Sequence, residues 1–162
     1  MAELRIGHGF DVHALVPERS LILGGVTIPY EMGLAGHSDA DVLTHAIIDA
    51  LLGAASLGDI GTHFPPTEET WRDADSLDLL KTVVKKLNQA GLKEIVNIDA
   101  TLMAQRPRLA PYLNAMRTRL ASVLPVVPER ISLKATTTEH LGFVGREEGI
   151  AASAVCLIAL NG

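Results

Sequence analysis

The run AASAVCLIAL, residues 151–160, is apolar at nearly every position, and it constrains the fold more than any other feature of the sequence. A strand of this composition has two faces that both need to be buried. Three helices are expected elsewhere in the chain, and they can cover one face of a sheet that contains this strand. The second face would stay open to solvent, so the sequence predicts self-association through that face.

Hydrophobic periodicity predicts an order of elements that is typical of a two-layer α+β domain. The expected strands are residues 4–15, 94–104, 131–138 and 149–160, with a hairpin at 21–28 and helices within 37–58, 76–91 and 106–124. The whole chain, residues 1–162, would form one domain with one mixed sheet and its helices on one face.

Capping residues set the expected helix boundaries. Ser38 is expected to be the N-cap of the first helix, with Asp41 in the capping-box position, and Asp75 or Ser76 would cap the second. Residues 58–76 are rich in Gly, Pro and Thr and lack periodicity. They are expected to form a mobile loop over a site rather than a boundary between domains.

The composition argues against two classes of partner. The formal net charge is −5 with 20% charged residues and 4% aromatic residues, and no block of five like charges occurs, so a nucleic-acid-binding surface is not expected. The chain has no apolar run of membrane-spanning length and no basic-then-apolar leader. The lone Cys156 lies in the apolar run and is expected to behave as a small buried hydrophobe. We therefore expect a cytoplasmic protein without a membrane partner.

Asp11 and His13 form the most unusual pair in the first expected strand. Alternation puts both side chains on the same face, about 6.6 Å apart, where they could share one ion. A catalytic zinc site needs a third protein ligand, for which His45 is the best candidate, and Asp49 on the same helix face could orient its other ring nitrogen. An Asp-x-His pair also occurs at ordinary hydrogen-bonded strand ends, so the spacing is compatible with zinc without demonstrating it.

Two further segments carry groups that suit a phosphorylated ligand. In AGHSDADV, His37, Ser38 and the amides of a helix start could bind phosphate, or the segment could simply cap the helix. In KATTTEHLGFVGREEG, the three threonines between Lys134 and Glu139 suit a diphosphate with Mg²⁺, or they belong to a Thr-rich strand with solvated ends. P-loop, dinucleotide-binding, G-x-S-x-G and C-x-x-C signatures are absent.

Together, five segments resemble the 2-C-methyl-D-erythritol 2,4-cyclodiphosphate synthase family. They are RIGHGFDVHAL, LILGGVTIPYEMGL, GHSDADVLTHAIIDALLGAASLGDIG, NIDATLMAQRPRL and LKATTTEHLGFVGREEGIAASAV, in the family's order from about Arg5 to the C-terminus. The resemblance implies that the substrate is 4-diphosphocytidyl-2-C-methyl-D-erythritol 2-phosphate, in the non-mevalonate route to isoprenoids. Its 2-phosphate would attack the β-phosphorus intramolecularly, release CMP and close a cyclic diphosphate, so that catalysis reduces to positioning and charge neutralisation.

The resemblance also implies roles for individual residues, at positions that match the family's motifs. Zinc, or another divalent cation, would be bound by Asp11, His13 and His45. Glu139 would bind Mg²⁺ or Mn²⁺, and the substrate phosphate would contact His37 and Ser38. The other assigned residues are Asp59, Ile60 and Gly61 for the methylerythritol group, Ala104, Pro107, Leu109, Ala135, Thr136 and Thr137 for cytidine, and Phe10, Arg146 and Glu148 for a central cavity.

The family is homotrimeric with active sites at subunit interfaces, and in some members the central cavity holds an isoprenoid diphosphate. Sheets packed around a trimer axis would cover the face that the helices leave open. Two positions depart from the family's pattern. Pro66 stands where Asp is common in the lid, which is the expected mobile loop at residues 58–76, and Val144 replaces a frequent Thr near the axis. These departures concern the lid's contacts and the axial ligand rather than the chemistry.

Two other function classes stay open at the level of the sequence. One is a non-catalytic, trimeric nucleotide-binding protein on the same scaffold, which would have no need for both expected metal sites. The other is a metallophosphohydrolase in which water replaces the 2-phosphate, although no general base is evident near the expected zinc ligands. Detection of CMP together with a cyclic rather than a linear product separates the three classes.

Overall fold

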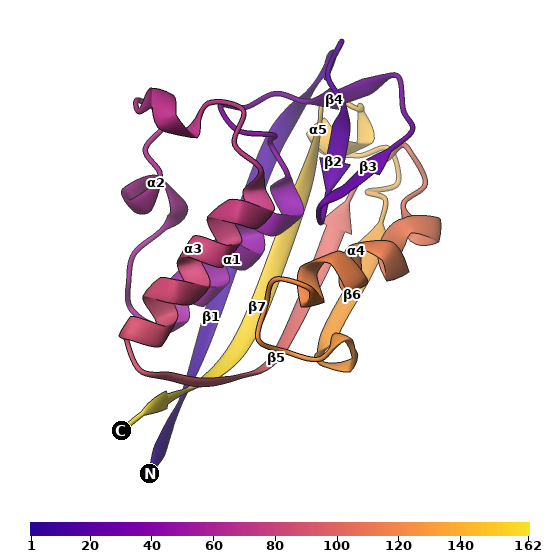
Figure 1. Ribbon diagram of the computed structural model, residues 1–162. Coiled ribbons are helices and arrows are strands. Elements are labelled where there is room, and N and C mark those ends of the chain that lie inside the picture. Colours follow the sequence, from indigo (N-terminus) through magenta and orange to yellow (C-terminus); the bar gives the residue numbers. More distant parts are fainter.

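The sheet is built around the apolar C-terminal run. The computed structural model describes residues 1–162, and its five-stranded sheet has the order β4-β1-β7-β5-β6 (Figure 1). Strand β7 (Gly149–Asn161) is the middle strand and runs antiparallel to both β1 (Ala2–Pro17) and β5 (Leu92–Met103). Strand β6 (Ile131–Thr136) is parallel to β5 at one edge, and β4 (Met32–Leu34) is antiparallel to β1 at the other. The expected mixed sheet is confirmed.

The longer helices lie on one face of this sheet, as expected (Figure 1). They are α1 (Val42–Ala54), α3 (Ser76–Gln89) and α4 (Leu113–Ala121). The remaining elements are the hairpin strands β2 (Leu21–Leu23) and β3 (Val26–Ile28), the short helices α2 (Ile60–His63) and α5 (Gly142–Gly145), and the 3-10 turns η1 (Glu69–Trp71), η2 (Ala110–Tyr112) and η3 (Pro128–Arg130). No helix has the length and apolar character needed to cross a membrane.

Two glycines let helix α1 lie directly on strand β1. A Cβ atom on Gly7 would lie 1.8 Å from the Ala50 carbonyl oxygen, and one on Gly9 would lie 1.9 Å from that of Ala46. No side chain fits at such distances, so the helix backbone packs against the bare strand. Asp11 and His13 continue the same face of β1 beyond the glycines. They therefore project towards the N-terminal half of α1, which carries His45.

The opposite face of the sheet carries apolar side chains that no helix covers. On β1, Ile6 is 74% exposed, Phe10 53% and Val12 43%, and on the neighbouring strand β7 Val155 is 44% exposed. Strand pairing places Phe10 opposite Ser153 and Ile6 opposite Leu157, so these side chains form one continuous surface across the two strands. The prediction that one face of the sheet stays open within a single chain is confirmed. The prediction that the protein self-associates through this face remains a prediction.

The start of α1 differs from the expectation. Asp41 rather than Ser38 is the N-cap, and its Oδ1 accepts a hydrogen bond of 3.0 Å from the Thr44 amide. The same carboxylate accepts hydrogen bonds from the amides of Gly24, at 2.9 Å, and Gly25, at 2.8 Å. The prediction of Ser38 as N-cap is wrong because the buried Asp41 carboxylate connects the helix start to the turn between β2 and β3, a contact between segments distant in sequence.

Three further features of the structure differ from the sequence pattern. The third helix begins at Leu113 rather than near residue 106, since prolines at 107 and 111 cannot donate backbone hydrogen bonds and restrict the residues before them. The expected loop 58–76 contains α2 and η1. The elements β4 and α5 were not expected, because they have too few residues to show a periodicity.

The cap of α3 agrees with the sequence pattern. Asp75 is confirmed as its N-cap, where the carboxylate accepts a hydrogen bond of 2.8 Å from the Leu77 amide.

Candidate active site

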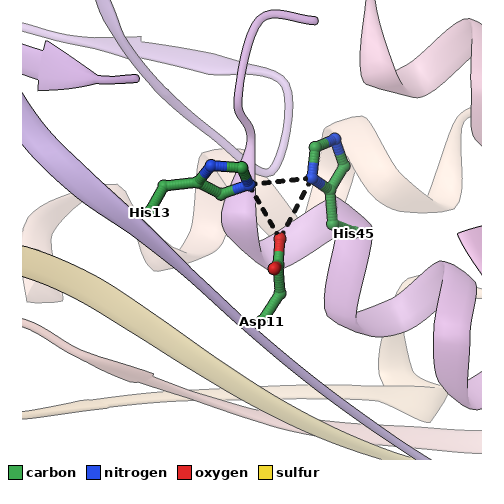
Figure 2. A group of neighbouring side chains, drawn as sticks. All are labelled: Asp11, His13 and His45. Carbon is green, nitrogen blue, oxygen red and sulfur yellow. Dashed lines mark hydrogen bonds and ion pairs between the residues drawn. The ribbon is translucent and has the colours of Figure 1, made fainter. Parts of the chain in front are cut away.

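Asp11, His13 and His45 meet at one point between β1 and α1, although His45 is more than thirty residues away in sequence (Figure 2). The Asp11 Oδ2 atom lies 2.9 Å from Nε2 of His13 and 3.1 Å from Nδ1 of His45, and the two nitrogens are 3.2 Å apart. Ligand atoms at tetrahedral angles around zinc would lie about 3.3–3.5 Å from one another. A shift of a few tenths of an ångström would therefore let these three atoms bind one ion, and they form a candidate metal site.

The protonation of His13 fits a ligand role. Its Nδ1 lies 2.7 Å from the Ala35 carbonyl oxygen, which can only accept, so Nδ1 donates and the neutral ring presents the lone pair of Nε2 to Asp11. Burial of the ring opposes its charged form, but the hydrogen bond and charge of Asp11 outweigh burial and raise the pKa of His13. Burial also opposes ionisation of Asp11, and the hydrogen bonds that the two rings donate when they are protonated outweigh it and lower the pKa of Asp11. The site therefore favours a positive charge at its centre.

The other ring nitrogen of His45 has a different partner from the one expected. Nε2 of His45 lies 2.8 Å from Oγ of Ser76 and 3.2 Å from Oγ of Ser38. Asp49 does not orient this ring: its Oδ1 accepts a hydrogen bond of 2.8 Å from the Ile60 amide, so it connects α1 to the start of α2. The prediction for Asp49 is wrong. Helix α3 places Ser76 next to the His45 ring, and the position of that helix cannot be predicted from local spacing in the sequence.

A cavity of about 250 Å³ contains the three residues of the candidate metal site and most of the residues that the resemblance assigns to the substrate's phosphate and methylerythritol groups. Its lining residues are Asp11, His13, His37, Ser38, His45, Ile60, Gly61, Phe64, Pro66, Trp71 and Leu79. Asp59 lies outside this lining and is exposed, and its carboxylate caps α2 by accepting from the Thr62 amide. The segment expected to lie over a site thus does border this cavity.

The apolar part of this wall was not identified from the sequence. The rings of Phe64 and Trp71 stack edge to face with centroids 5.0 Å apart, and Pro66 lies beside them in the lining. The ring of His37 donates to the Glu68 carbonyl oxygen across 3.0 Å, which holds this segment against the loop before α1. The sequence does contain an indication of this apolar wall, because aromatic residues are rare in this chain and two of them fall in residues 58–76.

A second cavity of about 500 Å³ is lined by every residue that the resemblance assigned to cytidine. These are Ala104, Pro107, Leu109, Ala135, Thr136 and Thr137, and the remaining lining residues are Tyr30, Gln105, Arg106, Arg108 and Ala110. Arg106 forms a two-point ion pair with Glu147, with contacts of 3.0 and 2.9 Å. Tyr30, from the segment after β3, carried no signal in the sequence. The two cavities share no lining residue.

The remaining assigned residues line neither cavity. Glu139 is exposed, and its amide donates to Thr137 Oγ1 across 3.3 Å, just beyond the wall of the larger cavity. Phe10 lies on the open face of β1, and Arg146 forms an exposed ion pair with Glu148 next to the start of β7. The structure brings Asp11, His13 and His45 together and leaves Glu139 apart from the lining around them.

Comparison with known proteins gives concordant matches. A 2-C-methyl-D-erythritol 2,4-cyclodiphosphate synthase of Moorella thermoacetica is 63% identical over 155 residues, 96% of this chain and 94% of that protein. The solved structure of IspF from Plasmodium falciparum with CDP has a TM-score of 0.85 at 31% identity, over 98% of this chain and 97% of that one. The bifunctional IspDF of Campylobacter jejuni has a TM-score of 0.94 at 45% identity and covers 99% of this chain, which spans 43% of its length.

The Moorella relative and one from Symbiobacterium thermophilum, also 63% identical, carry the name of the family that the sequence motifs resemble, and they match over 96% and 95% of this chain. The model of the YgbB family covers residues 4–159, which include the candidate metal ligands and both cavity linings. The chain therefore belongs to the YgbB family.

Proposed function

We propose that this protein, acting as one domain in the cytoplasm, is a 2-C-methyl-D-erythritol 2,4-cyclodiphosphate synthase. It converts 4-diphosphocytidyl-2-C-methyl-D-erythritol 2-phosphate into the cyclic diphosphate and CMP, a lyase reaction of the non-mevalonate route to isoprenoids. The observation that carries the proposal is the meeting of Asp11, His13 and His45 in a cavity, within a chain 63% identical to a synthase of that name.

The reaction needs no covalent intermediate with the protein. An oxygen of the substrate's 2-phosphate forms a bond to the β-phosphorus, and the bond from that phosphorus to the oxygen that bridges to the α-phosphate breaks. The departing oxygen keeps the electron pair and leaves as part of CMP. Positioning of the two phosphates and neutralisation of their charge are then the main tasks of the protein.

The metal cluster and its neighbours suit the charge-neutralising task. We propose zinc for the site of Asp11, His13 and His45, since two imidazoles and one carboxylate are a common zinc ligand set with room for one more ligand. When bound, the ion supplies Lewis-acid stabilisation of phosphate oxygen charge. Ser38 and His37 line the same cavity and contribute hydrogen-bonding groups towards a phosphate there.

The lid segment suits the positioning task. Ile60 and Gly61 bring backbone to the cavity beside the cluster, and the Phe64 and Trp71 rings close its apolar side. We assign the methylerythritol group to this region, with Asp59 at its outer edge. Exclusion of water by the rings strengthens the electrostatic interactions inside and suppresses simple hydrolysis.

The larger cavity suits cytidine. Its volume of about 500 Å³ lies within the range of small-molecule sites, and the Ala, Pro and Leu residues in its lining leave backbone groups free to recognise the base. Glu139, two residues beyond Thr137, is an exposed carboxylate near this wall. We propose that it binds Mg²⁺ or Mn²⁺ together with diphosphate oxygens, because Mg²⁺ takes few protein carboxylates and completes its shell with phosphate and water.

We further propose a homotrimer whose active sites combine the two cavities from neighbouring copies. Two observations support it: the cavities share no lining residue, and the apolar face around Ile6, Phe10 and Val155 has no cover within one chain. Packing three such faces around an axis would bury them. Phe10, Arg146 and Glu148 would then border a central cavity that could take an isoprenoid diphosphate.

One assay tests the proposed reaction directly. The purified protein is incubated with the cytidine diphosphate substrate and Mg²⁺, and the products are resolved by ³¹P NMR. CMP with a cyclic diphosphate supports the proposal. CMP with a linear product would identify a phosphohydrolase, and binding without turnover would identify a nucleotide-binding protein, and either result would refute the proposed reaction.

A further inference from the structure

The ring of His45 is connected to the half-buried carboxylate of Asp39 through one serine hydroxyl. Nε2 of His45 lies 2.8 Å from Oγ of Ser76, and that hydroxyl in turn hydrogen-bonds to Oδ1 of Asp39. Ser76 is fully buried at the first position of α3, and Asp39 precedes α1. The start of α3 and the segment formed by the loop before α1 and its first turn therefore meet behind the candidate metal site.

The directions of these hydrogen bonds can be deduced from the donors around Asp39. Its Oδ2 accepts from the Ser76 amide at 3.0 Å, and its Oδ1 accepts from the Asp41 amide at 3.1 Å. A carboxylate only accepts, so the Ser76 hydroxyl proton must point to Asp39. The lone pairs of Ser76 Oγ then face His45, and Nε2 of His45 must be the nitrogen that carries the proton.

This assignment leaves Nδ1 of His45 unprotonated, facing Asp11 Oδ2 at 3.1 Å and His13 Nε2 at 3.2 Å. The His45 ring therefore has the tautomer that metal binding needs, with the lone pair of Nδ1 facing Asp11 and His13. Ser38 Oγ lies farther away, at 3.2 Å, and accepts from the Ala40 amide. Ser38 has no carboxylate partner of its own, so it cannot impose a direction on the ring as Ser76 does.

We infer that Ser76 and Asp39 are positioning residues that set the metal affinity of the site by fixing the tautomer and orientation of His45. This inference rests on the proposed metal site. His13 obtains the same control from the backbone carbonyl of Ala35, which no substitution can remove. Of the groups that hold the two histidine rings in place, the Ser76–Asp39 pair is therefore the one that side-chain substitutions can alter.

The same pair joins the metal site to the end of the lid. The Asp39 amide donates to the Ala74 carbonyl oxygen at 3.1 Å, and the Asp73 amide donates to that of His37 at 2.8 Å. The lid's last residues and the start of α3 are thus held in register with the loop before α1. Ser76 reaches His45 because of this pairing.

The test compares Ser76→Ala with Thr44→Val. Thr44 is also fully buried, and its hydroxyl donates to a carboxylate, Asp41, at the start of a helix, but it has no hydrogen bond to the His45 ring. Both variants lose one hydrogen bond from a buried hydroxyl to a carboxylate. Zinc dissociation constants are measured by competition with a chelating dye, and thermal unfolding of the metal-free proteins is measured in parallel.

We expect the zinc dissociation constant to rise about 10- to 100-fold in Ser76→Ala and to change less than about twofold in Thr44→Val. Similar losses of zinc affinity in both variants, or no loss in Ser76→Ala, would overturn the inference while leaving the proposed function in place. Failure of the unchanged protein to bind zinc at this site would instead overturn the metal site itself, and the inference with it.

A measurement on the unchanged, metal-free protein covers the case in which a variant does not fold. The two ring nitrogens of His45 give distinct ¹⁵N signals according to which one carries the proton. We expect a protonated Nε2 and an unprotonated Nδ1 near neutral pH. The opposite tautomer, or an even mixture of the two, would refute the proposed role of Ser76 and Asp39.

Discussion

His13 and His45 point ring nitrogens at each other across 3.2 Å, and the same Asp11 oxygen lies within 3.1 Å of both. His13 presents a lone pair there because its other nitrogen donates to Ala35, and the same follows for His45 from Ser76. Three electron-rich atoms in contact repel one another unless a proton or a metal cation lies between them. This relationship is the physical reason to expect a cation at the site.

Replacement of His45 by alanine removes one of three ligands. We expect His45→Ala to lower bound zinc to trace levels and CMP release by at least about 100-fold, since even residues behind the ligands change affinity 10- to 100-fold. Zinc content is measured by atomic absorption and CMP by chromatography. Circular dichroism should show an unchanged fold, and normal turnover by a folded variant would contradict the assignment.

Replacement of Glu139 should separate the two proposed metal sites. Glu139→Gln keeps the shape of an exposed side chain and removes its charge. We expect zinc content to stay unchanged while Mg²⁺-dependent turnover falls about 100-fold, because a bound cation stabilises phosphate charge in the transition state by several kcal/mol. Titration of activity with Mg²⁺ checks this, and loss of zinc in this variant would contradict the two-site arrangement.

The stability of the metal-free protein should depend on pH through His13. Because the hydrogen bond and charge of Asp11 outweigh burial, the pKa of His13 is raised above its ordinary value of 6.5. Its contribution to stability is complete below pH 6.5 and is lost as pH rises through the raised value, with a slope of at most about 1.4 kcal/mol per unit for one proton. The lowered pKa of Asp11 acts only at more acidic pH.

We therefore expect urea denaturation midpoints of the chelator-treated protein to be lower at pH 8 than at pH 6. Added zinc should reverse this trend, because the metal binds the deprotonated ring. The His13→Gln variant is the control and should lose most of the slope. A rise in the midpoint of the metal-free protein between pH 6 and pH 8 would contradict the shift in the pKa.

The contact between β1 and α1 should tolerate no side chain at Gly9. A Cβ there would lie 1.9 Å from a helix carbonyl oxygen, so we expect Gly9→Ala to lower the free energy of unfolding by about 3 kcal/mol or more. In the matched control, Gly53→Ala in helix α1, the new Cβ would lie 4.0 Å from the His8 carbonyl oxygen of β1. That variant should gain about 0.5–1 kcal/mol. Equal effects in urea denaturation would contradict the packing.

The open face of the sheet should control assembly. Ile6 is 74% exposed there, and Ile6→Glu places a charge on the proposed interface. We expect the unchanged protein to sediment as a trimer at micromolar concentration and the variant as a monomer with little activity. Val127→Glu is the control, because Val127 is also apolar and 55% exposed but lies before η3, in the segment that leads to the edge strand β6 rather than on β1 or β7. A trimeric Ile6→Glu protein would contradict the proposed interface.

Much of this architecture follows from local patterns in the sequence. The apolar run at residues 151–160 predicts a strand with two faces to bury, and the alternation in residues 4–15 places Asp11 and His13 on one face. Both features need only the period of a strand. The extended family motifs add the cytidine residues, and all of these line one cavity.

The partners of individual polar groups were decided by the tertiary structure. Asp41 caps α1 because the turn at Gly24 and Gly25 reaches it, and Asp49 binds the Ile60 amide instead of His45. Ser76 lies behind His45 although 31 residues separate them. Local spacing predicts which groups share a face of a helix or strand. A buried hydrogen-bonding group, however, pairs with the partner that tertiary packing places within about 3 Å. That partner depends on how helices and strands that are distant in sequence pack together.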